Sequence, residues 1–368
     1  MLRAMRGAKK IATTRREFLA LAATLPLFSS CSDKNGDLQI DRRTEFSIGW
    51  SIYAGWTPWE YAERSGIVKR WADRYGLRID FVQIGDYVSS LELFRSGDVD
   101  GVTATLGDGF SLAAAGGRDT TVVLLNDYSN GNDGILSKTA SSVKELRGRR
   151  IHLQKGSASH YLLARALAKN GLDQSDVTLV NLSNVDIVSA YNSANVETVA
   201  AWNPELEIMR SSFGGTLLFD SSEIPGEIID ALLVDTQVLR NHPNLARALV
   251  GIWFETIRDL FSPDGAGAVA RDVITNLSGL SPEMYGLVMQ KTAFYRTPQQ
   301  VLQAMTSQDA INGVDARRKI RFEEGLAGGL SNIDEIGIQF ESRVLGNPDN
   351  IKFRFDPKWI RMAIKGQL

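Results

Sequence analysis

The sequence is poor in cysteine and histidine and is almost neutral. One cysteine among 368 residues excludes an internal disulfide framework and any multi-cysteine zinc or iron–sulfur site. Three scattered histidines argue against a histidine-rich metal centre. A formal net charge of −2 gives no general affinity for nucleic acid, because binding a polyanion needs clustered surplus lysine and arginine. We therefore expect no metal or other cofactor and no nucleic-acid partner.

The familiar sequence signatures of enzymes are also missing. There is no G-x-S-x-G, Walker loop or H-E-x-x-H, and no Gly-rich dinucleotide-binding turn follows a predicted strand. The composition, 43% hydrophobic and 23% charged, is that of an ordinary soluble globular protein and excludes disordered, collagen-like and polytopic membrane classes. A chain of 368 residues is long enough for two or three compact domains. These observations favour a binding protein over an enzyme.

The first thirty residues have the pattern of an export signal. Residues 1–16 contain six basic residues and no acidic one, and the apolar stretch 18–28 that follows is too short to span a bilayer. The segment Thr14 to Leu19, with Arg15 and Arg16, resembles the twin-arginine motif that is read by a translocase for folded proteins. The pattern predicts a periplasmic protein exported by the twin-arginine route.

The sole cysteine, Cys31, stands where cleavage is expected. The segment Leu27 to Cys31 resembles a bacterial lipobox, in which the cysteine becomes the lipid-bearing first residue, although Phe28 is unusual three places before it. The alternative is simple secretion, with Cys31 as an unpaired thiol. We expect a signal peptide at residues 1–30 and a polar tether at 31–44, and we favour a lipid on Cys31 as the only attachment to the membrane.

From Glu45 onward, short apolar runs alternate with helical patterns, which predicts an α/β fold with mainly parallel sheets. The turn-rich stretch 127–134 and a returning strand divide the chain into a first lobe, 45–127 plus 230–368, and a second lobe, 128–229. After Pro243 the pattern is helical, and these helices are expected to pack on the first lobe. Strands are predicted near 46–50, 79–84, 101–104, 121–126, 151–153, 177–180, 199–202, 216–219 and 228–234, and helices near 59–75, 87–96, 108, 157–170, 186–191, 205 and 245–260.

Aromatic, acidic and amide side chains gather just after the predicted strands. Open α/β sheets present their binding loops there, so we expect ligand contacts from these residues. Structural roles are the alternative for several of these residues. Asp86 and Asp108 can act as helix N-caps, and Trp56 and Trp59 can cover the hydrophobic core. Glu223 can belong to a turn. His160 has no recognisable acid–base partner, so no catalytic residue is predicted. The candidates are Trp56, Trp59, Asp86, Thr105, Asp108, Asp127, Ser159, His160, Trp202, Asn203 and Glu223.

Several motifs, in order and at consistent spacing, resemble the solute-binding proteins of ABC importers for sulfonates, taurine and nitrate. They are Gly49-Trp50, Gly55 to Trp59, Gly66-Ile67, Ser96 to Asp100, Lys155 to Leu163 and Ala201 to Pro204. The resemblance runs from about residue 45 to 366 and implies the type II periplasmic-binding fold, with two lobes joined by a two-strand hinge. Further segments are similar to the branch found beside urea carboxylase, whose members are described as urea importers and are associated with guanidine. These segments are Gln83 to Val88, Asp127 to Asp133 and Asp220 to Asp230.

The resemblance implies a monomeric receptor that closes on a small solute and delivers it to an ABC permease with its ATPase. Guanidinium offers donors and no acceptor, so it suits carboxylates and aromatic faces, and neutral urea remains open. Taurine, an alkanesulfonate or nitrate is the alternative, although an oxyanion calls for helix N-termini and basic side chains. A sensory lobe that presents ligand to a receptor also stays open. A pyrimidine synthase of thiamine biosynthesis shares this fold, but that reading predicts a cytoplasmic start and a cysteine-rich iron motif.

Overall fold

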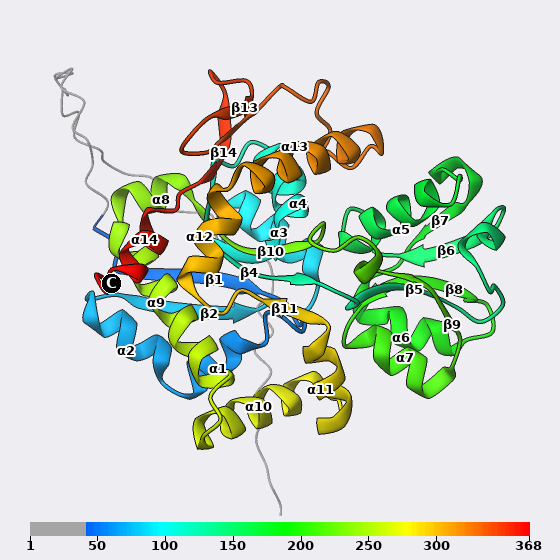
Figure 1. The fold of residues 1–368 in the computed structure, drawn as a ribbon, viewed down its shortest axis with the longest axis horizontal. Coiled ribbons are helices and arrows are strands. Elements are labelled where there is room, and N and C mark those ends of the chain that lie inside the picture. The colour runs from blue at the N-terminus through cyan, green and yellow to red at the C-terminus, as the bar shows by residue number, and fades with distance from the viewer. Residues whose placement is uncertain (1–41) are drawn as a thin grey trace, which may run out of the picture. The chain divides into compact units, whose positions relative to one another are not determined.

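The computed structural model describes residues 42–368 (Figure 1). The predicted signal peptide, Cys31 and the tether up to residue 41 lie outside the described residues. None of the helices within 42–368 is long and apolar enough to cross a membrane. Arg43, at the end of the predicted tether, forms an ion pair of 2.9 Å with Asp100.

The larger of the two sheets has nine strands in the order β13-β12-β14-β4-β10-β3-β1-β2, with β11 paired to β4. It is built from both ends of the described chain, because β4 and β10 lie in its middle between the early and late strands. The strands are β1 (Glu45–Trp50), β2 (Arg78–Gln83), β3 (Gly101–Thr105), β4 (Thr120–Ser129), β10 (Ile229–Asp235), β11 (Thr292–Phe294), β12 (Gly337–Gln339), β13 (Val344–Gly346) and β14 (Ile351–Phe355).

The smaller sheet has five strands in the order β7-β6-β8-β5-β9. Its strands are β5 (Asp133–Ser137), β6 (Arg150–Leu153), β7 (Thr178–Asn181), β8 (Thr198–Trp202) and β9 (Thr216–Asp220). Its helices are α5 (Ala158–Lys169), α6 (Asn184–Asn192) and α7 (Glu205–Phe213), with short 3₁₀ turns at Val143–Leu146, Gln174–Asp176 and Ser221–Glu223. Figure 1 shows this sheet and its helices as a group beside the larger sheet.

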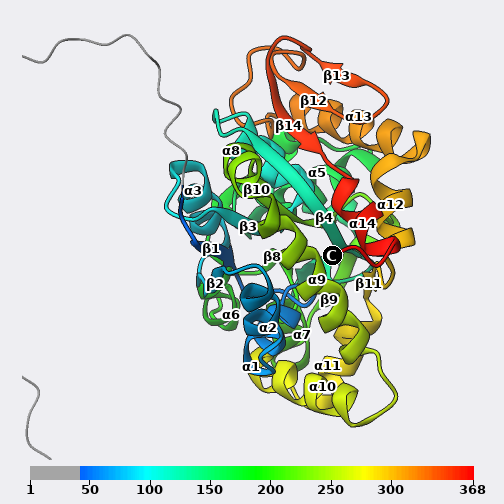
Figure 2. The ribbon, with the colours of Figure 1, turned by 90° about the vertical axis from the view of Figure 1, so that its left-hand side faces the viewer.

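Helices from both ends of the described chain pack together on the larger sheet. Helix α9 (Pro243–Leu260) contacts α1 (Pro58–Arg64), α2 (Ile67–Arg74), α10 (Gly265–Ser278) and α14 (Lys358–Ile364) (Figure 2). The remaining helices are α3 (Tyr87–Ser96), α4 (Leu106–Asp108) with the π-helix Gly109–Ala114, α8 (Thr236–Asn241), α11 (Pro282–Gln290), α12 (Pro298–Thr306) and α13 (Gln308–Glu323).

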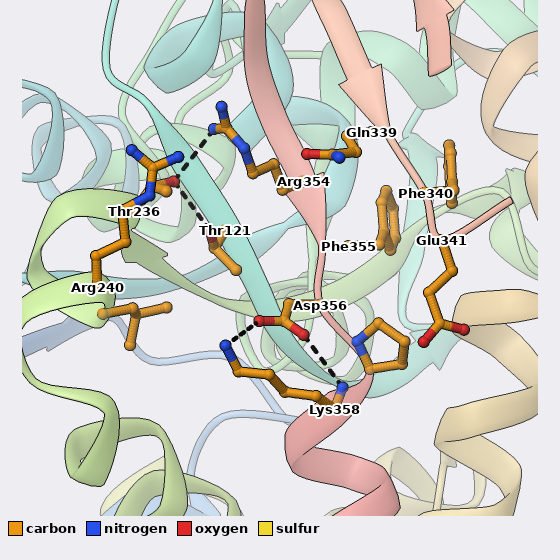
Figure 3. A pocket seen from close by; sticks show the side chains of 12 residues that line it. Thr121, Thr236, Arg240, Gln339, Phe340, Glu341, Arg354, Phe355, Asp356 and Lys358 are labelled. Atoms are coloured by element: carbon orange, nitrogen blue, oxygen red, sulfur yellow. Dashed lines mark hydrogen bonds and ion pairs between the residues drawn. The ribbon is translucent and has the colours of Figure 1, made fainter. Parts of the chain in front are cut away.

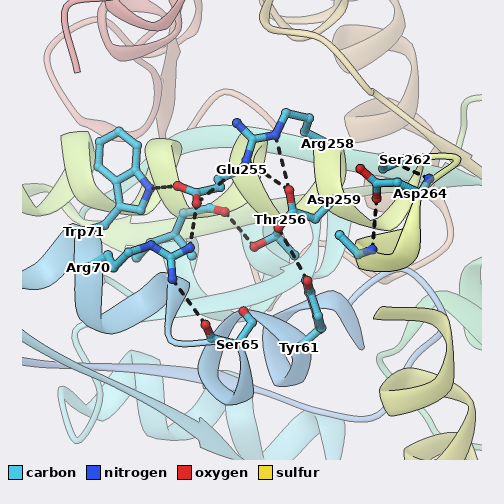
Figure 4. A network of polar contacts seen from close by, with 12 residues as sticks. Tyr61, Ser65, Arg70, Trp71, Glu255, Thr256, Arg258, Asp259, Ser262 and Asp264 are labelled. Carbon is cyan, nitrogen blue, oxygen red and sulfur yellow. Dashed lines mark hydrogen bonds and ion pairs between the residues drawn. The ribbon is translucent and has the colours of Figure 1, made fainter. Parts of the chain in front are cut away.

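A polar network links α9 to the two first helices (Figure 4). Glu255 accepts hydrogen bonds of 2.7 Å from both Trp71 Nε1 and Arg70. Because the Arg70 side chain is 56% exposed, its ion pair contributes only about 0–1 kcal/mol. The apolar side chains buried beneath it, such as the fully buried Trp253, carry most of the stabilisation of this interface.

The predicted α/β fold is confirmed, with mixed sheets. Half of the strand pairings are antiparallel, among them β10 with β3 and β4, and β5 with β8 and β9. Parallel pairing is kept in β2-β1-β3, β7-β6-β8 and β12-β14-β4. Most antiparallel pairs involve β4, β5 or β10, the strands at which the chain crosses from one sheet to the other and returns, whereas β12 and β13 pair with each other late in the chain.

Three local expectations were wrong. The predicted helix 59–75 is two helices, because Gly66 has φ 75 and ends the first one. The stretch 127–134 is not a single turn, since β4 continues to Ser129 through pairing with β10 and β11. The chain after Pro243 is not wholly helical, because β11 to β14 extend the larger sheet there. These short strands depend on partners that are distant in sequence.

The late helices also reach the second sheet. Arg317 of α13 donates a hydrogen bond of 3.1 Å to the backbone oxygen of Gly226, in the segment that returns from β9 to β10. Ile320 packs against the apolar core of the smaller sheet, and Gln174 donates to Glu324 at 2.7 Å. Helix α13 therefore contacts both groups of elements and does not pack on the first alone.

Candidate functional site

The central strands bring two aspartates face to face. In the antiparallel pairing of β10 with β4, Asp230 lies directly opposite Asp127, and on its other side it faces Thr105 at the end of β3. Asp133 begins β5 a few residues after β4 ends. The exposed fractions are 0% for Asp127 and Asp230 and 1% for Asp133, so three acidic side chains are buried where the chain passes from one sheet to the other.

These three carboxyl groups have few partners. Both carboxyl oxygens of Asp127 and of Asp230 are buried without a hydrogen-bond partner. The side chain of Asp133 accepts a long hydrogen bond of 3.5 Å from the hydroxyl group of Tyr53, and burial raises its pKa, which hydrogen bonding to Ser129 lowers in part. Of the ion pairs among residues 42–368, none joins a lysine or arginine to any of the three. Buried carboxyl groups without a counter-ion are costly unless they are protonated or receive a cation.

The electrostatics agree with that isolation. Burial raises the pKa of Asp127 from 3.8 to about 7, and the charge of Asp133 adds to the effect. Burial likewise raises the pKa of Asp133 to about 7 and holds that of Asp230 well above its usual range, where the charge of Asp127 contributes next. The hydroxyl pKa of Tyr53 is raised by burial and then by the charges of Asp133, Asp230 and Asp127. The charges of all three aspartates therefore affect the same hydroxyl group, which shows that the three side chains lie close together.

Four aromatic rings surround the same region. Successive ring centroids lie 5.1 Å apart for Tyr53 and Trp56, 5.4 Å for Trp56 and Tyr87, and 5.7 Å for Tyr87 and Trp202. Tyr53 and Trp56 come from the segment after β1, Tyr87 opens α3, and Trp202 ends β8. The indole Nε1 of Trp56 is buried without a hydrogen-bond acceptor. The rings thus meet from both sheets.

A small cavity lies between the rings and the acids. Its free volume is about 10 Å³, which is room for about one water molecule and far below the ~300–1,000 Å³ of pockets for drug-sized ligands. Its lining contains two carboxyl groups and no lysine, arginine or histidine, and Asp127 stands next to it through its pairing with Asp230. The lining residues are Tyr53, Trp56, Tyr87, Thr105, Asp133, Ala158, Trp202, Ile228 and Asp230.

Backbone geometry and hydrogen bonds hold these side chains in place. Gly55 is required beside Asp127, since a Cβ at this position would lie 2.2 Å from Oδ2 of the aspartate. The Tyr87 hydroxyl donates to Asp108 at 3.0 Å and accepts from the Thr105 backbone N–H at 3.1 Å. Asp108 in turn pairs with the buried Arg321 of α13. The ring of Tyr87 therefore faces the cavity while its hydroxyl is satisfied away from it.

The predicted site residues separate into two groups. Trp56, Thr105 and Trp202 line the cavity, Asp127 lies beside it, and Asp108 supports Tyr87 from behind. Asn203 donates to Asn132 at 2.9 Å and accepts from the Glu207 backbone, and Ser159 is buried in α5 with no partner for its hydroxyl.

The other predicted residues do not line the cavity. Trp59 is 0% exposed, donates to Thr103 at 2.9 Å and stacks on Phe81, so it belongs to the core. Asp86 caps α3 and accepts hydrogen bonds from Gln154 and Ser183 of the second group of elements. His160 bonds to Gln174 at 2.8 Å, and Glu223 is an exposed residue of a 3₁₀ turn.

The sequence candidates omitted Tyr53, Tyr87, Asp133 and Asp230. Asp230 had a visible signal, because it interrupts the apolar run from Ile228 to Val234 with a charge. A buried strand tolerates such a residue only where a specific partner or ligand meets it. Tyr53 and Asp133 stand in turn-rich segments, where their types alone carry no sign of burial.

A larger surface groove lies elsewhere on the larger sheet (Figure 3). It is charged, and two of its basic residues are paired: Arg354 contacts Asp119, and Lys358 pairs with Asp356 at 3.0 Å. Thr121 and Thr236 share a hydrogen bond of 2.9 Å across its floor. Among residues 42–368, moreover, no group of three or more histidine, cysteine, aspartate or glutamate side chains is arranged to hold a metal ion. The aromatic cavity is the stronger candidate for an organic ligand.

Comparison with known proteins identifies the scaffold. The taurine-binding periplasmic protein of Escherichia coli is 25% identical over 245 residues, which cover 64% of this chain and 74% of that protein. The alkanesulfonate-binding protein of Xanthomonas axonopodis pv. citri, bound to MOPS, superposes with a TM-score of 0.66 at 20% identity over 77% of this chain and 94% of that one. The nitrate-binding protein of Synechocystis superposes with a TM-score of 0.55 at 12% identity over 89% of this chain and 99% of that one. The NMT1-like family matches residues 51–272, so this α/β protein belongs to that family and has the fold of periplasmic solute-binding proteins.

Proposed function

We propose that this protein is the solute-binding component of an ABC importer and that it captures guanidinium in the cavity between Asp230, Asp133 and the aromatic rings. The observation that carries the proposal is the cluster of three buried carboxyl groups without a basic partner among the described residues. Such a cluster is unfavourable when ionised and empty. A cation in the cavity would turn that cost into attraction.

Guanidinium matches the cavity in charge, shape and hydrogen-bonding capacity. It is planar, permanently charged and carries donors only, so it complements carboxylate oxygens that lack donors. Charge-assisted hydrogen bonds to carboxylates are about twice as strong as neutral ones. The face of Trp56 or Trp202 would add roughly 0.5–2 kcal/mol of cation–π attraction, depending on desolvation. Both kinds of partner are in the cavity lining.

An anionic ligand fits this cavity less well. A like-charge pair about 4 Å apart costs about 4 kcal/mol at an effective dielectric constant of about 20, and several carboxylates would oppose the ligand. The N-terminus of α5, where Ala158 lines the cavity, would offer up to about 2 kcal/mol in return. Although relatives are named for taurine and alkanesulfonates, the side chains here favour a cation over a sulfonate or nitrate.

Urea is the second candidate from the same reasoning. It has the size and planarity of guanidinium and four N–H donors, but it is neutral and presents a carbonyl oxygen that needs a donor. The indole N–H of Trp56, buried without an acceptor, is one group that could meet that oxygen. Urea would gain no Coulomb attraction from the acids, so we expect it to bind more weakly than guanidinium.

The importer role follows from the two-lobed arrangement. We propose lobes of residues 45–127 plus 230–368 and 128–229, joined by the crossing after Ser129 and the return at Ile228, whose backbone atoms are hydrogen-bonded at 2.9 Å. The cavity takes residues from both lobes, so a ligand would favour the closed form by contacting both at once. The closed form would then be recognised by a permease and its ATPase, on the periplasmic side to which the predicted signal directs the protein.

Isothermal titration with guanidinium chloride, urea, taurine and nitrate, at matched ionic strength, tests the ligand. We expect the strongest binding for guanidinium and none for taurine or nitrate. Asp230→Asn should weaken guanidinium binding at least about tenfold, since it removes one charge-assisted contact. The exposed Asp272→Asn is the matched control and should bind like the wild type. Binding of taurine or nitrate with no response to guanidinium would overturn the proposal.

A further inference from the structure

The walls of the cavity are made of buried residues. None of its nine lining residues is more than 7% exposed, and the most exposed of them is Thr105. They come from the segment after β1, the start of α3, the ends of β3 and β8, the start of β5, the start of α5 and the return into β10. A ligand held there would be in contact with buried side chains from both sheets.

The free space between the side chains is very small. It is about 10 Å³ between four aromatic rings, so any organic ligand has to move the surrounding side chains apart, and the non-aromatic apolar part of the wall is made by Ala158 and Ile228. Protein interiors of this kind resist extra methyl groups, because neighbouring side chains must leave their preferred rotamers to make room. A substituent on the ligand would have to displace one of these walls.

An alkyl substituent would also remove a hydrogen-bond donor. Among the described residues, no donor lies within hydrogen-bond distance of the carboxyl oxygens of Asp127 and Asp230. Burial raises the pKa of Asp230, although the Trp56 indole is near enough to lower it in part, and the two carboxyl groups affect each other's pKa. The N–H groups of a ligand would supply the missing donors. Replacing an N–H by N–CH₃ leaves a buried acceptor unmet. An N-alkyl substituent therefore weakens binding in two ways: it clashes with the cavity wall, and it leaves a carboxyl oxygen without a hydrogen-bond donor.

We infer that the cavity selects the unsubstituted guanidinium ion and excludes its N-alkyl derivatives, with Ile228 and Ala158 as specificity-determining residues. The inference rests on the proposed guanidinium function and adds the ligand class that this site rejects. Arginine and agmatine are excluded as well, since the chain attached to their guanidinium group would have to displace the buried side chains that line the cavity. The receptor therefore serves free guanidine and not the guanidino group of larger metabolites.

The test compares guanidinium, methylguanidinium, agmatine and arginine by isothermal titration of the full protein. In the wild type we expect methylguanidinium to bind ~10–200-fold more weakly than guanidinium, and agmatine and arginine to give no measurable heat. Ile228→Ala and the milder Ala158→Gly enlarge the cavity. Each should reduce the ratio of the methylguanidinium and guanidinium dissociation constants at least about fivefold. Ile151→Ala makes the same truncation in the core of the second lobe, away from the cavity, and should leave the ratio of the two dissociation constants unchanged.

The outcomes separate this inference from the function on which it rests. If guanidinium itself does not bind, the proposed function fails. If guanidinium and methylguanidinium bind the wild type equally, or agmatine binds, the function stands and the exclusion of substituents is wrong. If methylguanidinium is rejected but neither cavity variant admits it, Ile228 and Ala158 do not set the selectivity. If Ile228→Ala does not fold, Ala158→Gly still tests whether these two residues set the selectivity.

Discussion

The ligand-free protein should lose stability as the pH rises, because its buried acids hold protons in the folded state. Burial raises the pKa of Asp127 from 3.8 to about 7. Between these values the folded chain keeps a proton that the unfolded chain has released, so each rise in pH favours unfolding. The stabilisation is complete below 3.8, declines through this window and is lost above about 7. This direction is opposite to that of an aspartate held by a salt bridge.

The size of the effect follows from the shift. One pKa unit corresponds to about 1.4 kcal/mol, so Asp127 alone contributes up to about 4 kcal/mol across the window, of which about 2 kcal/mol is lost between pH 5 and pH 7. Asp133, whose pKa is also raised to about 7 chiefly by burial, acts in the same direction. A loss of about 2 kcal/mol would lower the melting temperature by roughly 3 °C.

Thermal unfolding, followed by tryptophan fluorescence from pH 5 to pH 8, measures this slope without the use of urea or guanidinium as denaturant. Asp127→Asn cannot ionise, so it should flatten the slope and be more stable than the wild type at pH 8 while binding guanidinium less well. Asp272→Asn, on the exposed face of α10, is the control and should follow the wild type. Equal slopes in the wild type and Asp127→Asn would refute the view that this carboxyl titrates as a buried acid.

Three further predictions separate ligand contacts from structural support. Gly55→Ala should weaken guanidinium binding at least about tenfold in titration, because its Cβ would meet the neighbouring carboxylate at 2.2 Å, whereas Gly85→Ala, with nothing within 4 Å, should not. Trp59→Ala should lower the free energy of unfolding by about 3–5 kcal/mol and leave the dissociation constant unchanged; a weaker affinity with unchanged stability would make it a ligand contact. Asp108→Asn should cost about 3–5 kcal/mol in thermal unfolding, since it leaves a buried arginine unpaired; a loss below 1 kcal/mol would contradict this.

Local signals in the sequence were enough for much of the fold. The range of α3 was predicted from an aspartate that can cap it and a glycine that can end it, and both act as expected: Asp86 accepts from the Ser89 backbone at 2.8 Å, and Gly97 has φ 92. The extension of β4 to Ser129 was missed, since its partner β11 lies more than 160 residues later. Information held in such distant pairings is absent from any short window of sequence.

The sequence predicted the kinds of side chain in the candidate site better than it predicted which individual residues line it. The expectation of acids and rings at strand ends brought Trp56, Asp127 and Trp202 into the candidate set, because strand ends are a property of topology. It also brought in Trp59, which stands one turn further along and faces the core. Whether an indole faces a cavity or the core depends on how its helix is rotated against neighbouring elements. The amino-acid types around it do not determine that rotation.

The charge of the ligand is decided by far fewer residues than the fold. This chain, which shares 25% identity with a taurine-binding protein over 64% of its length, has a helix N-terminus at the cavity, a feature suited to an anion. Yet the cavity walls carry Asp133 and Asp230 with Asp127 beside them, and no lysine or arginine. Since three ionised buried acids would outweigh one helix terminus in electrostatic energy, our proposal of a cation ligand rests on a few side chains at one sheet edge. Ligand assignment in this family therefore has to be argued from the residues that face the cavity, not from the similarity of the scaffold.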